Sequence, residues 1–374
     1  MQIQYDELMR VKVVTPLEGT PAQRAGLHTD DIIIKVNGES TAGFTLDQAV
    51  DVITGPKNTK VSLTVEREVD GEKVEKDFDL IRMPIKLRSV KGWKRLGADE
   101  DDWDWFVDHK SGIGYVRLTQ FTENTSSDLI RAVASMRKEG LNGLVLDLRF
   151  NPGGLLDQAV AVVGEFVTNG VVVTTENADG QRTGVEKTNG SGGELADIPL
   201  AILINPGSAS ASEIVSGALQ DYAGWGKIDA IVIGKRSFGK GSVQNAWPLP
   251  TRAQTILKVT TQYYRLPGGR LIHRRPGMTD WGIDPDYVVD MLPKQNAEAI
   301  TIRRDADVLP LDENGNIIVS KDKPLANPDD LLTKGIDLQL EAAIVLLKSR
   351  TLHVPEAAGV VGTLDVEQDD ESAG

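Results

Sequence analysis

Residues 143–150, GLVLDLRF, decide the fold, and the turn NPGG follows them at 151–154. A short, continuous apolar run of this kind is typical of a strand that is buried on both faces of a parallel sheet. A helical stretch (155–167), a strand (170–175) and a second buried strand, PLAILIN (199–205), come next. Strands that alternate with helices predict βαβ units and a mostly parallel sheet, so we expect an α/β fold.

The alternation of strands and helices continues on both sides of this stretch. The strand GIGYVRL (112–118) and an amphipathic helix (124–139) precede the central run, and DLQLEAAIVLLKSR (337–350) predicts a last helix. We interpret 85–295 and 327–350 together as one domain.

Two segments fall outside this core. Residues 296–326 show neither the alternation typical of a strand nor the apolar spacing typical of a helix, so we interpret them as an inserted segment. Residues 355–374 form an acidic tail that we expect to be disordered.

Residues 1–84 predict a separate small domain. Strands are expected at 11–14 and 60–69, and Asn37-Gly38 favours a tight turn because both residues tolerate positive φ. The helical pattern at 45–55 begins with Thr45 as a plausible N-cap.

Composition excludes several classes of function. The chain has 374 residues, a formal net charge of −14 and no cysteine. A strongly acidic chain is a poor candidate for binding nucleic acid. Disulfides and thiolate metal sites are excluded, and the four histidines are widely spaced, so a histidine-rich metal site is not expected. No stretch reaches the ~18 apolar residues of a membrane span.

Five blocks of the chain carry a family resemblance. Residues 17–38, LEGTPAQRAGLHTDDIIIKVNG, resemble the core of a PDZ domain. GIGYVRLTQF (112–121), DLRFNPGGLL (147–156), GSASASEIVSGALQD (207–221) and SFGKGSVQ (237–244) together resemble the tail-specific, or C-terminal processing, serine peptidases. Each block alone is weak evidence, whereas the ordered set is specific to this family.

The resemblance implies a crotonase/ClpP-like α/β protease core with an N-terminal PDZ domain. It implies a serine endopeptidase that acts on proteins or peptides recognised near their C-termini, without a cofactor, and it leaves a homo-oligomer open. The implied nucleophile is Ser210, the implied general base is Lys240, and the helper glutamine is Gln244. The implied oxyanion donors are the backbone N–H groups of Ala211 and of Gly153 or Gly154. The implied peptide-binding residues of the PDZ domain are Ile3, Val50 and Ile53.

The chemistry explains why these residue types are needed. A lysine can deprotonate serine only when it is neutral, and burial lowers its free pKa of ~10.4. We expect the stretch 242–250, SVQNAWPLP, to exclude water there. If the segment is extended, residues 240, 242 and 244 share one face, so that Gln244 orients the amine. Ser210 is expected near a helix N-terminus, and the glycines after a neighbouring strand let a carbonyl approach the backbone.

The sequence departs from the family pattern at three places. Lys240 follows Ser210 by 30 residues, a longer spacing than we expect, which the loop 222–229 absorbs. Thr54 stands where some members carry an activating arginine. The chain begins inside the expected PDZ domain and shows no signal peptide, although the resemblance implies a periplasmic or cell-envelope protein.

Three alternatives stay open. Ser208 and Ser212 are rival nucleophiles. The same fold also accommodates a catalytically inactive PDZ-containing binding protein, or a crotonase-like enzyme that acts on an acyl thioester. The presence of both Ser210 and Lys240 favours the peptidase.

Overall fold

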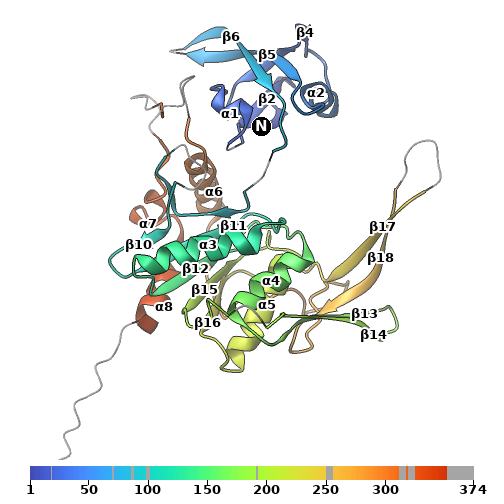
Figure 1. The fold of residues 1–374 in the computed structure, drawn as a ribbon, viewed down its shortest axis with the longest axis vertical. Coiled ribbons are helices and arrows are strands. Elements are labelled where there is room, and N and C mark those ends of the chain that lie inside the picture. The colour runs from blue at the N-terminus through green and yellow to red at the C-terminus, as the bar shows by residue number, and fades with distance from the viewer. Residues whose placement is uncertain are drawn as a thin grey trace, which may run out of the picture.

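A computed structural model describes residues 1–17, 19–69, 71–85, 88–97, 102–190, 193–249, 256–310, 317–318 and 325–351. The small N-terminal domain stands beside a larger α/β core, and α6 lies between them in the view of Figure 1. No helix in these described ranges is long and apolar enough to cross a membrane.

The N-terminal domain is built on one antiparallel sheet with the order β1-β2-β3-β5-β6, with β4 paired to β3. Thr45 and Gln48 form the capping box that starts its main helix, as the N-cap prediction required. Asn37 and Gly38 have φ of 51° and 83°, which confirms the predicted turn. Its elements are β1 (Gln2–Tyr5), β2 (Val11–Thr15), α1 (Pro21–Arg24), β3 (Ile32–Val36), β4 (Glu39–Ser40), α2 (Leu46–Ile53), β5 (Lys60–Val69) and β6 (Glu72–Ile81).

The core sheet has the order β10-β11-β12-β15-β16-β19, with β7 paired to β11. Within this sheet, neighbouring strands run parallel from β11 through β12, β15 and β16 to β19, which confirms the mostly parallel sheet. The residues of the central strand β12 are all buried, as expected for a strand covered on both faces. The strands are β7 (Val90–Lys91), β10 (Phe106–Asp108), β11 (Ile113–Leu118), β12 (Gly143–Asp147), β15 (Leu200–Ile204), β16 (Ala230–Gly234) and β19 (Tyr287–Val288).

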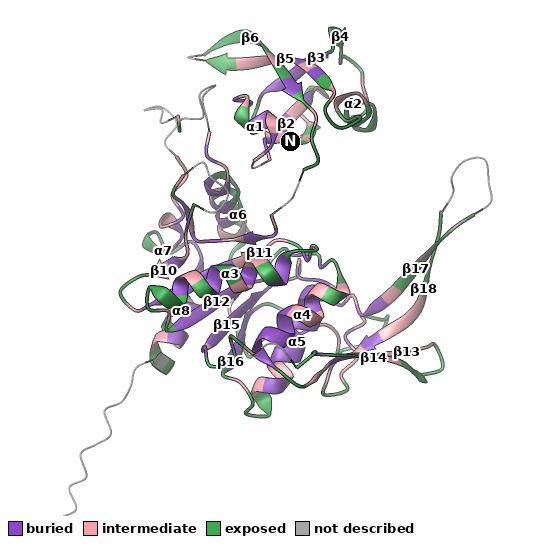
Figure 2. Cartoon of the chain, viewed as in Figure 1, coloured by how far each residue is buried: buried purple, intermediate pink, exposed green. Residues whose placement is uncertain are grey.

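Side-chain alternation divides the interior into two apolar clusters. Leu144 and Leu146 belong to the cluster with α3, α4 and α5, whereas Val145 belongs to the cluster with α6, α7 and α8. Figure 2 shows the buried strands between these helices. The helices are α3 (Thr125–Lys138), α4 (Leu156–Phe166), α5 (Ala211–Gly224), α6 (Pro293–Asp307), α7 (Asp330–Thr333) and α8 (Leu338–Thr351).

A second, antiparallel sheet has the order β14-β13-β18-β17. Its outer ribbon, β17 with β18, projects away from the core in Figure 1. The strands are β13 (Val171–Glu176), β14 (Arg182–Lys187), β17 (Ser242–Pro248) and β18 (Ile256–Arg265); a short pair, β8 (Lys94–Arg95) and β9 (Trp103–Asp104), forms separately.

The segment interpreted as an insertion begins inside a helix. Residue 296 falls within α6, whose Ala299 and Ala306 are buried. Residues 311–316 and 319–324 of that segment, and the tail at 355–374, lie outside the described residues.

Candidate active site

Ser210 occupies the turn between β15 and α5. Its backbone has φ 57° and ψ −115°, a conformation that glycine adopts more easily than serine. Ala211 is the first residue of α5 and is buried. A strained residue at the start of a helix is a recurrent feature of functional turns, because the surrounding contacts must hold it there. The structure therefore places Ser210 at a helix N-terminus, as the sequence predicts.

The NPGG turn after β12 supplies those contacts. The carbonyl of Asn151 accepts hydrogen bonds from Ala209 N at 3.0 Å and from Ser212 Oγ at 2.9 Å. Ser208 Oγ donates to Leu148 O at 2.8 Å. Both neighbouring serines are therefore fully buried and bonded to the backbone of this loop, which leaves half-buried Ser210 as the serine best placed to meet a substrate.

Gly153 packs directly against the serine turn. A Cβ at this position would lie 2.8 Å from Ser210 Cβ and 2.9 Å from Ala211 N. Gly153 N donates to Asn151 Oδ1 at 2.9 Å, whereas Gly154 N has no acceptor among the described residues. Gly154 thus keeps an N–H group without an acceptor in the described structure, whereas Gly153 is the glycine that lies against Ala211 N.

Lys240 follows β16, a strand that the sequence analysis missed. β12, β15 and β16 are consecutive in the parallel sheet, so the loops after their carboxyl ends meet at one edge. Phe238 N donates to Ser208 O at 2.9 Å and joins the lysine segment to the serine turn. The structure thus brings Lys240 and Ser210 to the same loop cluster.

Glu213 connects the two predicted catalytic residues. Its Oε2 accepts hydrogen bonds from Ser210 N and Lys240 N, each at 2.8 Å, so these nitrogens cannot be farther apart than twice that distance. Its Oε1 accepts from Ser237 Oγ and Gly239 N, each at 2.6 Å. The sequence analysis overlooked this residue, although Ser210-x-x-Glu213 matches the spacing of a capping box and could have revealed it.

The Glu213 carboxyl is fully buried, and the hydrogen bonds it accepts come from neutral groups. Burial raises its pKa, and the hydrogen bonds from Ser237, Gly239, Lys240 and Ser210 counteract that rise. A buried carboxyl group with this many donors is a strong local constraint, because each donor would otherwise lack a partner.

Two expectations about the segment after Lys240 are wrong. Gln244 and the stretch beyond it are largely exposed, so SVQNAWPLP does not cover the site. The reason is that β17 leaves the core after Val243 and continues in the projecting ribbon.

The strand also begins only at Ser242, and its register with β18 shifts between Val243 and Gln244, so positions 240, 242 and 244 do not follow one regular face. No hydrogen bond joins Gln244 to Lys240 in the described structure.

A buried ionic brace holds the end of β12. Arg149 pairs with Asp147 and Asp337, each at 2.7 Å, and Tyr115 Oη donates to Asp147 at 2.8 Å. Arg149 links the strand that leads into the NPGG turn to the start of α8. Within the described ranges, no cluster of three or more histidine, aspartate or glutamate residues has the arrangement of a metal site.

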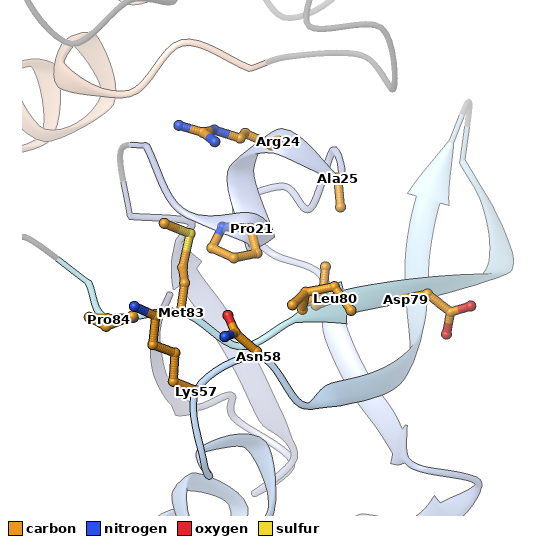
Figure 3. A pocket seen from close by; sticks show the side chains of 10 residues that line it. Pro21, Arg24, Ala25, Lys57, Asn58, Asp79, Leu80, Met83 and Pro84 are labelled. Atoms are coloured by element: carbon orange, nitrogen blue, oxygen red, sulfur yellow. The ribbon is translucent and has the colours of Figure 1, made fainter.

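The expected peptide-binding residues lie on β1 and α2 of the N-terminal domain. Ile3 and Ile53 are half-buried and pack against the core of that domain, whereas Val50 is exposed. An open cleft of about 720 Å³ lies elsewhere, between α1 and the end of β6. Figure 3 shows Pro21, Leu80 and Met83 around it, with Arg24 and Lys57 near its borders. None of the three expected residues lines this cleft.

Comparison with known proteins defines the class. Residues 112–289 match the model of peptidase family S41, and residues 2–66 match the PDZ domain model. The chain therefore belongs to peptidase family S41, and its core follows an N-terminal PDZ domain.

The relatives carry the same description. The chain is 41% identical over 291 residues to a "Carboxy-terminal-processing protease" of Bartonella bacilliformis, covering 76% of this chain and 60% of the relative. It is 36% identical over 300 residues to a "Probable CtpA-like serine protease" of Staphylococcus aureus, covering 80% of this chain and 53% of that protein. The chain thus spans somewhat more than half the length of these curated relatives.

Among solved structures, the chain is similar to a photosystem II D1 C-terminal processing protease, with 28% identity and a TM-score of 0.44 over 78% of this chain and 71% of that one. It is also similar to a putative S41 protease from Bacteroides fragilis, with 16% identity and a TM-score of 0.49 over 91% and 82% of the two chains.

Proposed function

We propose that this chain is a serine endopeptidase of the C-terminal processing type that uses a Ser210/Lys240 dyad. The observation that carries the proposal is the shared Glu213 oxygen, which holds the backbones of both residues beside the NPGG turn. Membership of family S41 supports the same reaction class.

In the proposed mechanism, the neutral amine of Lys240 takes the proton from the Ser210 hydroxyl as this oxygen attacks the peptide carbonyl. The carbonyl oxygen becomes negatively charged and is stabilised by two N–H groups, that of Ala211 at the start of α5 and that of Gly154 in the NPGG turn. Lys240 then gives its proton to the departing amine, and water releases the acyl group from Ser210 by the reverse sequence. Gln244 forms no hydrogen bond with Lys240 in the described structure, and we propose that it orients the amine only during turnover.

Substrate selection is proposed to lie in the PDZ domain, where β1 and α2 together would take the C-terminal segment of a protein. Ile3, Val50 and Ile53 would contact its side chains. We also propose a periplasmic or cell-envelope location, which fractionation of the source cells would test.

The decisive experiment incubates the wild type, Ser210→Ala and Lys240→Ala with an unfolded protein and follows new peptide ends by mass spectrometry. Cleavage by the wild type alone is the expected result. Equal cleavage by all three proteins would refute the dyad. An inactive wild type that still binds C-terminal peptides would instead favour the binding-protein alternative.

A further inference from the structure

Two arginines next to the lysine segment are each stacked on an aromatic ring. Arg274 Cζ lies 4.5 Å from the centre of the Trp281 ring, and Arg275 Cζ lies 4.4 Å from the centre of the Tyr263 ring. Stacking of this kind holds a planar guanidinium by its face and leaves its N–H groups at the edge available for a planar acceptor.

The backbone of these arginines adjoins the residues on either side of Lys240. Arg274 N donates to Gly239 O at 2.9 Å, and a Cβ on Gly239 would lie 2.8 Å from Arg274 Cβ. On the other side, a Cβ on Gly241 would lie 2.6 Å from His273 N. The glycines around Lys240 therefore allow residues 273–274 to pack directly on the lysine segment.

The Tyr263 stack lies on the strand next to β17. Tyr263 pairs with Ser242, two residues after Lys240. The His273 ring lies 4.9 Å from the Tyr263 ring, centre to centre. Arg275 is therefore held close to the point where the lysine segment enters the projecting ribbon.

The charge balance here is unusual for this chain. The formal net charge is −14, yet neither Arg274 nor Arg275 has an ion-pair partner among the described residues. Their neighbour Arg236, in contrast, pairs with Asp284. His273 Nδ1 is buried without a hydrogen-bond partner in the described structure. Two exposed, oriented guanidinium groups without an ion-pair partner in the described structure form a surface that suits an external carboxylate.

We propose that Arg274 and Arg275 form a carboxylate-binding subsite beside Lys240 that holds an acidic group of the peptide substrate. The proposal rests on the proposed peptidase function and adds a substrate property to it. The carboxylate can belong to the free end of the substrate chain or to an aspartate or glutamate side chain. A chain end bound here would lie within a few residues of the bond that Ser210 attacks, so the subsite would favour removal of short tails.

The test measures peptide binding separately from catalysis. In the Ser210→Ala background, one labelled peptide without acidic side chains is titrated as its C-terminal acid and as its C-terminal amide, and a third form carries an added glutamate and an amide end. Arg274→Gln/Arg275→Gln is expected to weaken binding of the acid about tenfold, the effect of losing a charge-assisted hydrogen bond, and to leave the amide unchanged. If only the glutamate form responds, the carboxylate comes from a side chain, which also supports the subsite.

Two controls make the result specific. Arg131→Gln, an exposed position on α3 outside the sheet that carries Tyr263, removes a charge elsewhere and should leave all three affinities unchanged. Arg274→Lys/Arg275→Lys keeps the charge but loses the planar fork, so binding of the acid should be intermediate. Equal affinity of the double glutamine variant and its parent for every carboxylate form would overturn the subsite. Cleavage of the amide by the Ser210-containing enzyme, measured in parallel, tests the peptidase function independently.

Discussion

Ser210 and Lys240 donate their backbone N–H groups to the same atom, Glu213 Oε2, although 30 residues separate them in the sequence. Glu213 lies one turn into α5, so the helix that begins at Ser210 also fixes the lysine segment. The distance in space between the backbones of the two residues is therefore set by a buried carboxyl group rather than by the length of the chain between them.

Replacing this carboxyl by an amide should disable the enzyme. Glu213→Gln turns one acceptor into an N–H₂ donor that faces two other donors, and each buried unsatisfied group costs about 1–3 kcal/mol. We expect a loss of stability of a few kcal/mol in urea unfolding, together with loss of peptide hydrolysis. Glu341→Gln, on the exposed side of α8, is the matched control and should change neither. A fully active Glu213→Gln enzyme would contradict the role given to this residue.

A methyl group at Gly153 should separate the two loops of the site. Gly153 has φ 100°, and its Cβ would meet the backbone of the serine turn at 2.7–2.9 Å. Gly140 has a similar φ of 92° but no atom within 4 Å of such a Cβ. Gly153→Ala should therefore abolish hydrolysis, while Gly140→Ala should show only the ~1–2 kcal/mol strain of a positive φ in thermal unfolding and retain its turnover. Similar activity in the two variants would show that the close packing is dispensable.

Acid should destabilise the protein through Asp307. Burial alone would raise the pKa of this carboxyl, but Arg117 and Lys91 outweigh burial and hold the pKa well below its ordinary 3.8. The stabilisation is therefore present above pH 3.8 and is lost as the pH falls toward the folded-state value. Asp307→Asn should be less stable than the wild type at neutral pH and should lose less stability on acidification. Urea unfolding from pH 7 to pH 3 measures both slopes, with the exposed Asp179→Asn as control.

Lys240 and Gln244 should differ in importance. Loss of a general base typically costs 10²–10⁴-fold in rate, so Lys240→Ala should lose about that much kcat. Gln244 is exposed and lies beyond the register shift in β17, so Gln244→Ala should lose only about tenfold in kcat, the effect of one hydrogen bond. Comparable losses in initial-rate assays would show that Gln244 reaches the amine during turnover.

Much of the fold could be read from the sequence because its signals are local. The run at 143–150 identifies a buried strand by composition alone, and Thr45 identifies the start of α2 by its capping chemistry. β16 was missed because AIVIG is short and stands alone between a loop and the SFGKG turn. The projecting ribbon could not be anticipated, since an apolar stretch such as SVQNAWPLP also fits a buried strand.

The residues of the candidate site likewise divide into those that a local motif reveals and those that only the folded chain brings together. Ser210 and Lys240 were identified by their sequence blocks, whereas three of the four hydrogen bonds to Glu213 exist only after the segment 237–240 has met the start of α5. Arg274 is likewise far in sequence from Gly239, the residue whose backbone it contacts. Contacts of this kind depend on the order of the strands in the sheet, which no local pattern encodes.

The glycine-like backbone of Ser210 implies a trade-off between durability and turnover. Ser210→Gly would relax the turn and remove the hydroxyl, which should yield a more stable but inactive protein. Selection for robustness alone would therefore tend to eliminate the nucleophile. A side chain held in so unfavourable a conformation favours the proposed role of the hydroxyl.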